Sequence, residues 1–211
     1  MPPRISDSTV RRLSHYLRGL EEAERRGVPT VSSQDMAVWG GTTAAQVRKD
    51  LSQFGSFGKR GMGYAVPRLA QRLREIMGLD HPWKIALVGA GRIGSALHAY
   101  PRFRERGFQC MAVLDSDPEK IGQHWGSTVV EDVADLERII REREVRMVIL
   151  AVPASAAQEV ADRAVSAGAR GILNFAPTRL RVPPEVSVAN VNLVIEMEAL
   201  SFDLTRKARG G

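Results

Sequence analysis

The sequence predicts an α/β protein of two modules, a mostly helical N-terminal module followed by a doubly wound parallel sheet. Two observations predict this fold. The apolar run 84–88 enters a glycine-rich turn at 89–94, and apolar runs then alternate with helix-like segments to about residue 175. Before residue 81, apolar residues recur at helical spacing instead.

Composition is typical of a globular protein outside the membrane. The chain has 211 residues, of which 44% are hydrophobic and 26% charged. No apolar run reaches the ~20 residues that a membrane helix needs, and the N-terminus lacks the apolar stretch of a secretion signal. We therefore expect a cytoplasmic protein. The single cysteine, Cys110, excludes an internal disulfide and lies in a predicted buried strand.

The positive charge is concentrated in the first module. Residues 1–80 hold 13 Lys and Arg against 8 Asp and Glu, a balance of +5, whereas residues 81–211 hold 17 against 16, a balance of +1. A basic module joined to a nearly neutral one favours a polyanion as the partner of the first module.

The first module has the pattern of a helix-turn-helix. A first helix carries its apolar stripe at Val10, Leu13, Leu17 and Leu20. Ser32 and Ser33 then cap a short helix, and Gly40-Gly41 makes a tight turn. Thr43 and Gln46 predict a capping box, in which the hydroxyl accepts from the backbone at Gln46 and the Gln46 amide reaches back. The helix that this box opens runs to about Phe54.

This second helix would enter a major groove of double-stranded DNA with its first turns nearest the bases. Its polar face supplies the candidate DNA-binding side chains Gln46, Arg48, Lys49 and Ser52. Residues 55–64, rich in glycine, favour a β-hairpin wing that places Lys59 and Arg60 on phosphates or in a minor groove. The alternative is an ordinary amphipathic helix with a solvated polar face.

The glycine turn of the second module is typical of a dinucleotide site. Gly89 permits a tight turn, Gly91 lets the backbone approach a pyrophosphate, and Gly94 lets the following helix pack close to the strand. Asp115, 21 residues after Gly94, ends the next apolar run. Its carboxylate suits the adenosine ribose hydroxyls and favours NAD(H), because a 2′-phosphate would meet a negative charge.

The rest of the second module alternates between strands and helices. We predict strands over 84–89, 109–114, 147–152 and 171–175 and helices near 92–106, 134–143 and 155–167, followed by a final helix within Val191–Arg209. We divide the chain into a winged-helix DNA-binding domain (1–80), a Rossmann-type NAD(H)-binding domain (83–191) and a C-terminal helix (192–211). The apolar stripe of this last helix either covers the core of the second module or inserts into a partner subunit, which would make it a dimerisation helix.

Several motifs together resemble the redox-sensing transcriptional repressor family Rex, over nearly the whole chain. They are Tyr16-Leu17-Arg18, 46–52, the wing 58–64, the turn 89–94, Asp115-Ser116-Asp117-Pro118, Asn174-Phe175-Ala176-Pro177 and Leu200-Ser201-Phe202. The resemblance implies a homodimer whose C-terminal helices are exchanged between subunits. It also implies binding to a pseudo-palindromic operator. NADH binding would release the protein from this operator, whereas NAD⁺ would compete weakly and leave the protein bound.

The resemblance also implies roles for individual residues. The cofactor-binding set is Gly89, Ala90, Gly91, Arg92, Ile93, Gly94, Tyr100, Asp115, Val152, Pro153 and Asn174. In better-known members an Asp near the C-terminus pairs with the residue matching Arg18 and couples the domains; here the aligned residue is Asn192, a neutral amide that cannot form an ion pair. Leu193 stands where members of the family often have Phe.

Two other functions compete with an NADH-controlled repressor. An NAD-dependent oxidoreductase would need a proton donor near the nicotinamide, but His124 is the one histidine after Asp115, and the chain has little room for a catalytic domain. The four histidines also lack metal-ligand spacing. We therefore expect no catalytic residue, no metal and no enzymatic activity. A nucleotide- or CoA-binding module would leave the basic helix and the wing unexplained.

Overall fold

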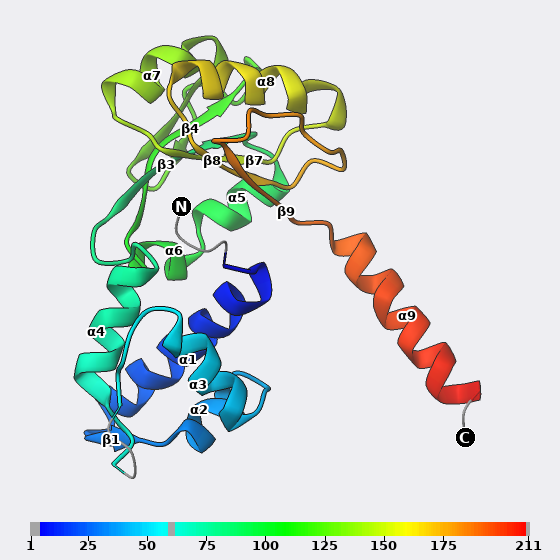
Figure 1. Ribbon diagram of the computed structural model, residues 1–211. Helices are drawn as coiled ribbons and strands as arrows, with labels where there is room; N and C mark the ends of the chain where they lie inside the picture. Colours follow the sequence, from blue (N-terminus) through cyan, green and yellow to red (C-terminus); the bar gives the residue numbers. More distant parts are fainter. Residues whose placement is uncertain (1–4, 59–61, 210–211) are drawn as a thin grey trace. The chain divides into compact units, whose positions relative to one another are not determined.

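The computed structural model describes residues 5–58 and 62–209 of the chain. Two compact units make up the chain, Met1–His81 and Pro82–Gly211 (Figure 1). No helix in the described ranges is long and apolar enough to cross a membrane.

The first unit is a helical bundle with a small sheet. Its helices are α1 (Asp7–Arg25), α2 (Ser33–Trp39), α3 (Ala44–Ser52) and α4 (Val66–Ile76). The buried face of α1 includes the predicted Leu13, Leu17 and Leu20, but Val10 is 44% exposed and Tyr16 is fully buried in the core. Tyr16 follows Leu13 by three residues and precedes Leu20 by four, so it lies on the same face of the helix, and the predicted stripe should have included it.

The two short helices α2 and α3 begin at capped residues. Ser32 and Asp35 form a reciprocal capping box at α2. At α3, Thr43 Oγ1 accepts from the Gln46 backbone N–H at 3.2 Å, as predicted. The predicted return bond from the Gln46 amide is wrong, because Gln46 Nε2 donates to Asp50 Oδ1 at 2.8 Å instead.

The predicted hairpin over 55–64 takes a different form. Strand β2 (Tyr64–Ala65) pairs antiparallel with β1 (Thr30–Val31), the segment that precedes α2. Residues 55–58 form no strand. The candidate residues Lys59 and Arg60 lie outside the described residues.

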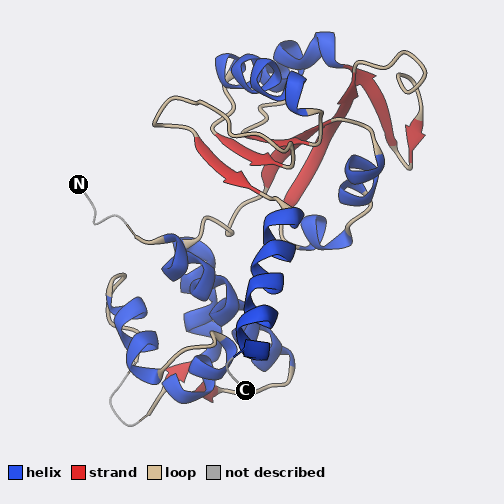
Figure 2. Cartoon of the chain, turned by 90° about the vertical axis from the view of Figure 1, so that its right-hand side faces the viewer, coloured by secondary structure: helices blue, strands red, loops and turns tan. Residues whose placement is uncertain are grey.

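The second unit contains, within the described residues, a seven-stranded sheet in the order β5-β6-β4-β3-β7-β8-β9 (Figure 2). The strands are β3 (Trp83–Val88), β4 (Phe108–Asp115), β5 (His124–Trp125), β6 (Thr128–Asp132), β7 (Met147–Leu150), β8 (Gly171–Asn174) and β9 (Ser187–Asn190). Every pairing is parallel except that of β5 with β6. The chain builds outward from β3 through β4 to β6 and then returns to β7 on the other side of β3. This doubly wound order opens a crevice at the carboxyl ends of β3 and β7.

Helices cover both faces of this sheet (Figure 1). One face packs against α7 (Leu136–Glu142) and α8 (Ala154–Ala167), and the other is lined by Leu97 and Phe103 from the short helices α5 (Arg92–His98) and α6 (Pro101–Glu105). A 3-10 turn, η1 (Val133–Asp135), leads into α7. The predicted single helix over 92–106 is therefore wrong. It breaks at Ala99-Tyr100, because Pro101 begins a new helix and cannot continue the first one.

The final helix α9 (Leu193–Arg209) carries the exposed apolar side chains of the chain's end. They are Leu193, Val194, Ile195, Met197, Leu200, Phe202 and Leu204, each more than half exposed. Such a surface on one helix is typical of a segment that packs against a partner.

Candidate functional site: a dinucleotide cradle and a DNA-facing helix

The glycine turn joins β3 to α5 with two glycines that leave no room for a side chain. Gly89 has φ +106, and a Cβ there would lie 2.3 Å from the Ala151 carbonyl oxygen. A Cβ on Gly94 would lie 2.0 Å from the Gly89 carbonyl oxygen. Gly91 differs from both, because a Cβ there would meet nothing within 4 Å. The turn is thus packed against the segment after β7 at Gly89 and against its own backbone at Gly94, and it is open at Gly91.

Asp115, at the end of β4, is bonded to this turn. Its Oδ2 accepts from the Ala90 backbone N–H at 2.6 Å and from Lys120 Nζ at 3.3 Å, while its Oδ1 accepts from the Asp117 N–H at 2.9 Å. Burial favours a raised pKa, but these donors hold the pKa of the Asp115 carboxyl below its ordinary value. The carboxylate therefore carries its charge beside the turn and fixes its position.

A cavity of 590 Å³ lies at the carboxyl ends of β3 and β7. It is lined by the turn glycines Gly89 and Gly91, by Asp115, and by Val152-Pro153 after β7. Of the other turn residues, Ala90 and Gly94 are buried, and Arg92 and Ile93 are exposed. An open backbone at Gly91, an ionised carboxylate and an apolar wall are the groups that an adenine dinucleotide requires, so the residues present fit that cofactor.

Two predicted cofactor residues lie elsewhere. Tyr100 lines a different cavity of 440 Å³, where its ring stacks edge-on against Phe103 with centroids 5.6 Å apart. Asn174 is fully buried, and its side chain amide forms hydrogen bonds only within the second unit. Its Nδ2 donates to the Thr178 carbonyl at 2.8 Å and to Asn190 Oδ1 at 2.9 Å, and its Oδ1 accepts from the Ala176 N–H at 3.0 Å. Asn174 therefore shapes the segment after β8 and does not line the 590 Å³ cavity.

The first unit exposes three of the four candidate DNA-binding side chains on α3. Arg48, Lys49 and Ser52 are exposed, and Gln46 is half-buried. Arg48 Nη1 donates to Ser33 Oγ at 3.0 Å, so this guanidinium lies beside the start of α2. Ser52 Oγ donates to the Lys49 carbonyl at 2.8 Å.

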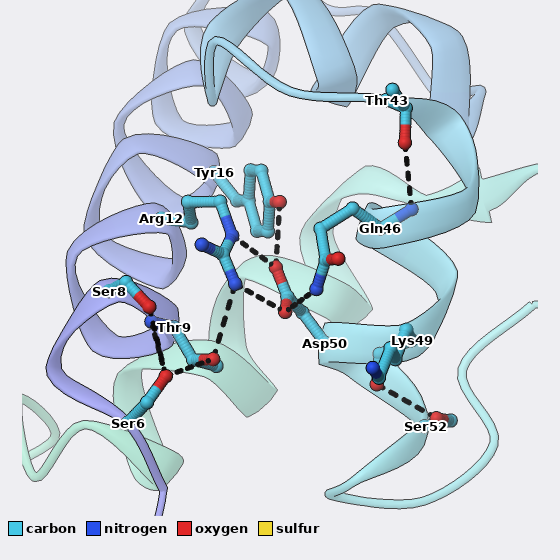
Figure 3. Close-up of polar contacts among 10 residues, drawn as sticks. All are labelled: Ser6, Ser8, Thr9, Arg12, Tyr16, Thr43, Gln46, Lys49, Asp50 and Ser52. Carbon is cyan, nitrogen blue, oxygen red and sulfur yellow. Dashed lines mark hydrogen bonds and ion pairs between the residues drawn. The ribbon is translucent and has the colours of Figure 1, made fainter.

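A buried polar network behind α3 was not predicted from the sequence (Figure 3). Asp50 is completely buried yet accepts four hydrogen bonds, from Arg12 Nε, Arg12 Nη2, the Tyr16 hydroxyl and Gln46 Nε2. Burial favours a raised pKa for Asp50, but the Arg12, Gln46 and Tyr16 donors hold its pKa below the ordinary value. The available signal was a carboxylate between the apolar positions Val47 and Leu51.

The two residues predicted to couple the domains lie in different units. Arg18 is exposed on α1. Asn192 precedes α9, and its Oδ1 accepts from the backbone N–H groups of Val194 at 3.0 Å and Ile195 at 3.4 Å. Asn192 thus caps α9, a role that the sequence did not suggest.

Known proteins resemble both units. A family described as "Putative DNA-binding protein N-terminus" matches residues 4–52, and one described as "CoA binding domain" matches residues 80–178. The redox-sensing transcriptional repressor Rex of Carboxydothermus hydrogenoformans is 49% identical over 203 residues, covering 96% of this chain and 98% of its own length. That of Desulforamulus reducens is 45% identical and covers 98% of each chain. The chain belongs to the Rex family.

Solved Rex structures share its fold. A Rex-family repressor, RSP, superposes with a TM-score of 0.88 at 35% identity, covering 98% of this chain and 96% of its own. RSP in complex with β-NAD⁺ and operator DNA gives 0.91 at 36% identity, covering 99% and 98%. RSP in complex with β-NADH gives 0.87 at 34% identity, covering 98% and 97%. The predicted α/β architecture, a DNA-binding N-terminal module joined to a doubly wound sheet, is confirmed.

Among the described residues, no group of three or more His, Cys, Asp or Glu side chains could hold a metal ion. The Rex relatives are named as repressors, and RSP has been crystallised with both forms of the nicotinamide cofactor and with DNA.

Proposed function

We propose that this chain is a DNA-binding transcriptional repressor controlled by the NADH/NAD⁺ ratio, and that NADH releases it from a palindromic operator. The observation that carries the proposal is the joining, in one chain, of an exposed basic recognition helix and an open glycine turn beside an ionised Asp115. RSP binds both ligand classes, operator DNA and β-NAD⁺ or β-NADH.

The DNA side of the proposal uses residues 1–80. Arg48 and Lys49 are exposed on α3 and supply cations to phosphates or guanine edges, and Ser52 adds a hydroxyl. Arg48 is held beside Ser33, which favours a phosphate contact at the start of α2 over a base contact. Lys59 and Arg60 are assigned by the glycine-rich pattern of the wing and by the family motif, because they lie outside the described residues.

The cofactor side uses residues 83–191. The open backbone at Gly91 would receive the pyrophosphate, Asp115 the ribose hydroxyls, and Val152-Pro153 the nicotinamide side. The nicotinamide cofactor supplies the difference that is sensed, one hydride and one positive charge on its ring. We propose that the chain binds this cofactor without turning over a substrate, and that Tyr100 contacts the cofactor, a role that the family resemblance alone supports because Tyr100 lines a separate cavity.

Residues 192–211 complete the proposal as a dimerisation helix. The apolar side chains of α9 are exposed in the single chain, and a second copy would cover them. A two-fold dimer presents two recognition helices to the two halves of a palindrome. Sedimentation velocity should give a dimer for the full chain, and Leu200→Glu with Leu204→Glu should give monomers.

Control of DNA binding requires that NADH bind the DNA-competent and DNA-released conformations unequally. A coupling of about 3 kcal/mol would change DNA affinity about a hundredfold. The adenosine half is the same in NADH and NAD⁺, so the discrimination must arise around the nicotinamide ring.

The test is fluorescence anisotropy of a labelled duplex that the full chain has selected from a randomised palindromic library. We expect release by NADH at concentrations where NAD⁺ has little effect, and no consumption of NADH during the titration. Tight DNA binding that ignores both nucleotides would contradict the redox control. Failure to select any duplex while NADH still binds would favour the oxidoreductase instead.

A further inference from the structure

The orientation of the Gln46 side chain amide is set by its neighbour. Gln46 lies in the first turn of α3, the part of a recognition helix that meets base edges. Its Nε2 donates to Asp50 Oδ1 at 2.8 Å. Figure 3 shows the amide nitrogen turned toward Asp50 and the amide oxygen turned away from it.

This orientation cannot be reversed while Asp50 is ionised. A carboxylate only accepts hydrogen bonds, so it can face the NH₂ end of the amide but not its oxygen. Asp50 itself cannot turn, because Arg12 Nε and Nη2 hold its two oxygens at 2.7 and 2.8 Å and the Tyr16 hydroxyl donates to Oδ2 at 3.0 Å. The side chain of Asp50 is completely inaccessible to solvent, which keeps water from replacing these donors.

A glutamine that is held this way offers an ordered pair of groups. One proton of Gln46 Nε2 is donated to Asp50. The amide oxygen remains available as an acceptor and the second Nε2 proton as a donor. Adenine presents the matching pair in the major groove, an N6 amino donor beside the N7 acceptor. In the major groove thymine and guanine present only acceptors, so neither can donate to the amide oxygen, and cytosine presents an amino donor without the neighbouring N7 acceptor.

We propose that Gln46 reads the amino group of an adenine in the operator, and that Asp50, from behind α3, is the residue that positions Gln46 for this contact. The inference rests on the proposed function, because it assigns a base to a helix proposed to enter DNA. It adds a specificity residue and a buried positioning residue to that function.

The chain contains a matched control for this arrangement. Gln71 on α4 also donates to a carboxylate four residues later, with Nε2 at 3.3 Å from Glu75 Oε1, but both side chains are exposed. Glu75 also accepts from Arg72 Nη1 at 2.8 Å, but Arg72 keeps 52% of its side chain exposed, so this pair lies at the surface and not inside the helical unit. Gln71→Met therefore removes the same chemistry at a place that the proposal does not use.

The experiment removes one amino group at a time from the selected duplex. Each adenine is replaced in turn by purine, which lacks the N6 amino group, and binding is measured by anisotropy for the wild type, Gln46→Met and Gln71→Met. We expect one adenine in each half-site at which purine weakens wild-type and Gln71→Met binding about tenfold. Gln46→Met should bind adenine and purine equally at that position.

Asp50→Asn tests the positioning role. The side chain has nearly the same shape, but its amide can face Gln46 with either end, so the Gln46 amide can turn over. Discrimination between adenine and purine at that position should fall several-fold, although Gln46 is still present. Circular dichroism will show whether Asp50→Asn is folded; if it is not, Tyr16→Phe removes one of the bonds that hold Asp50 and should weaken the same discrimination.

Three results would overturn the proposal. If Gln46→Met responds to every purine replacement as the wild type does, Gln46 reads no amino group. If a folded Asp50→Asn or Tyr16→Phe protein keeps full discrimination, Asp50 does not position Gln46. If the wild type selects no duplex at all, the proposed function fails and this inference fails with it, an outcome distinct from the other two.

Discussion

Asp50 on α3 and Arg12 on α1 form a bidentate ion pair, with Nε and Nη2 of the guanidinium 2.7 and 2.8 Å from the two carboxylate oxygens. The pair joins α3 to α1 across 38 residues of sequence. Asp50 is fully buried, while Arg12 keeps 20% of its side chain exposed. A buried carboxylate with all its partners in place rigidifies the contact between two helices, and its loss leaves an unpaired cation.

The first prediction concerns stability. Asp50→Ala should lower the free energy of unfolding by about 3–5 kcal/mol, because Arg12 is left without its partner inside the helical unit. Urea denaturation followed by circular dichroism measures this change. Glu22→Ala removes the exposed pairs with Arg25 and Arg26 and should cost no more than about 1 kcal/mol. Equal effects of the two substitutions would contradict the special role of Asp50.

The second prediction concerns pH. Bonds from Arg12, Gln46 and Tyr16 depress the pKa of Asp50 in the folded protein despite its burial. A depressed pKa contributes stability above the unfolded pKa, about 3.9, which is lost as the pH falls through the lower folded pKa. The stability lost between pH 5 and pH 3 should therefore be smaller for Asp50→Asn than for the wild type. Parallel urea-midpoint curves for the two proteins over that range would contradict this account.

Part of this architecture could be predicted from the sequence and part could not. The glycine turn and the strands around it are encoded locally, by apolar runs and by residues that only a tight turn requires. Strand β6 was missed because only Val130 within Thr128–Asp132 is buried, so the stretch has no strong apolar run. The break at Tyr100 was missed because the pattern was read across Pro101.

The buried network around Asp50 shows more clearly which contacts could not be predicted from the sequence. Gln46 matched a capping box by spacing, and only the position of Asp50 within the fold decides that its amide turns the other way. Arg12 and Asp50 are too far apart in sequence for any local rule to pair them. The exposed candidates Arg48 and Lys49 needed no tertiary information, because they lie opposite the apolar stripe of one helix.

The third prediction separates the glycines of the turn. Gly94→Ala should lower stability by about 3 kcal/mol, because its Cβ would lie 2.0 Å from the Gly89 carbonyl oxygen and the backbone must shift. Gly91→Ala should fold within about 1 kcal/mol of the wild type, because its Cβ meets nothing within 4 Å. The added methyl group would nevertheless occupy the space proposed for the pyrophosphate and should weaken NADH binding at least about tenfold.

Thermal unfolding and NADH fluorescence titration measure the two properties separately. A folded Gly91→Ala protein with unchanged NADH affinity would show that the pyrophosphate does not pass over residue 91.

The fourth prediction uses the cap of α9. Asn192 Oδ1 accepts from the Val194 and Ile195 N–H groups, and an Asp carboxylate accepts the same bonds equally well. Asn192→Asp should therefore keep α9 helical while adding the negative charge that the family resemblance implies for this position. If that charge pairs with Arg18, the difference in DNA affinity with and without NADH should widen about tenfold.

The control is Arg18→Ala, alone and combined with Asn192→Asp. If the two positions form an ion pair, Arg18→Ala should abolish the wider difference in DNA affinity that Asn192→Asp produces. A double-mutant cycle of operator affinities, measured with and without NADH, tests this. Asn192→Ala serves as the capping control, because it removes the acceptor at a cost of about 1 kcal/mol without adding charge. A gain from Asn192→Asp that survives Arg18→Ala would show that the charge acts through another residue, and that coupling in this repressor does not depend on Arg18.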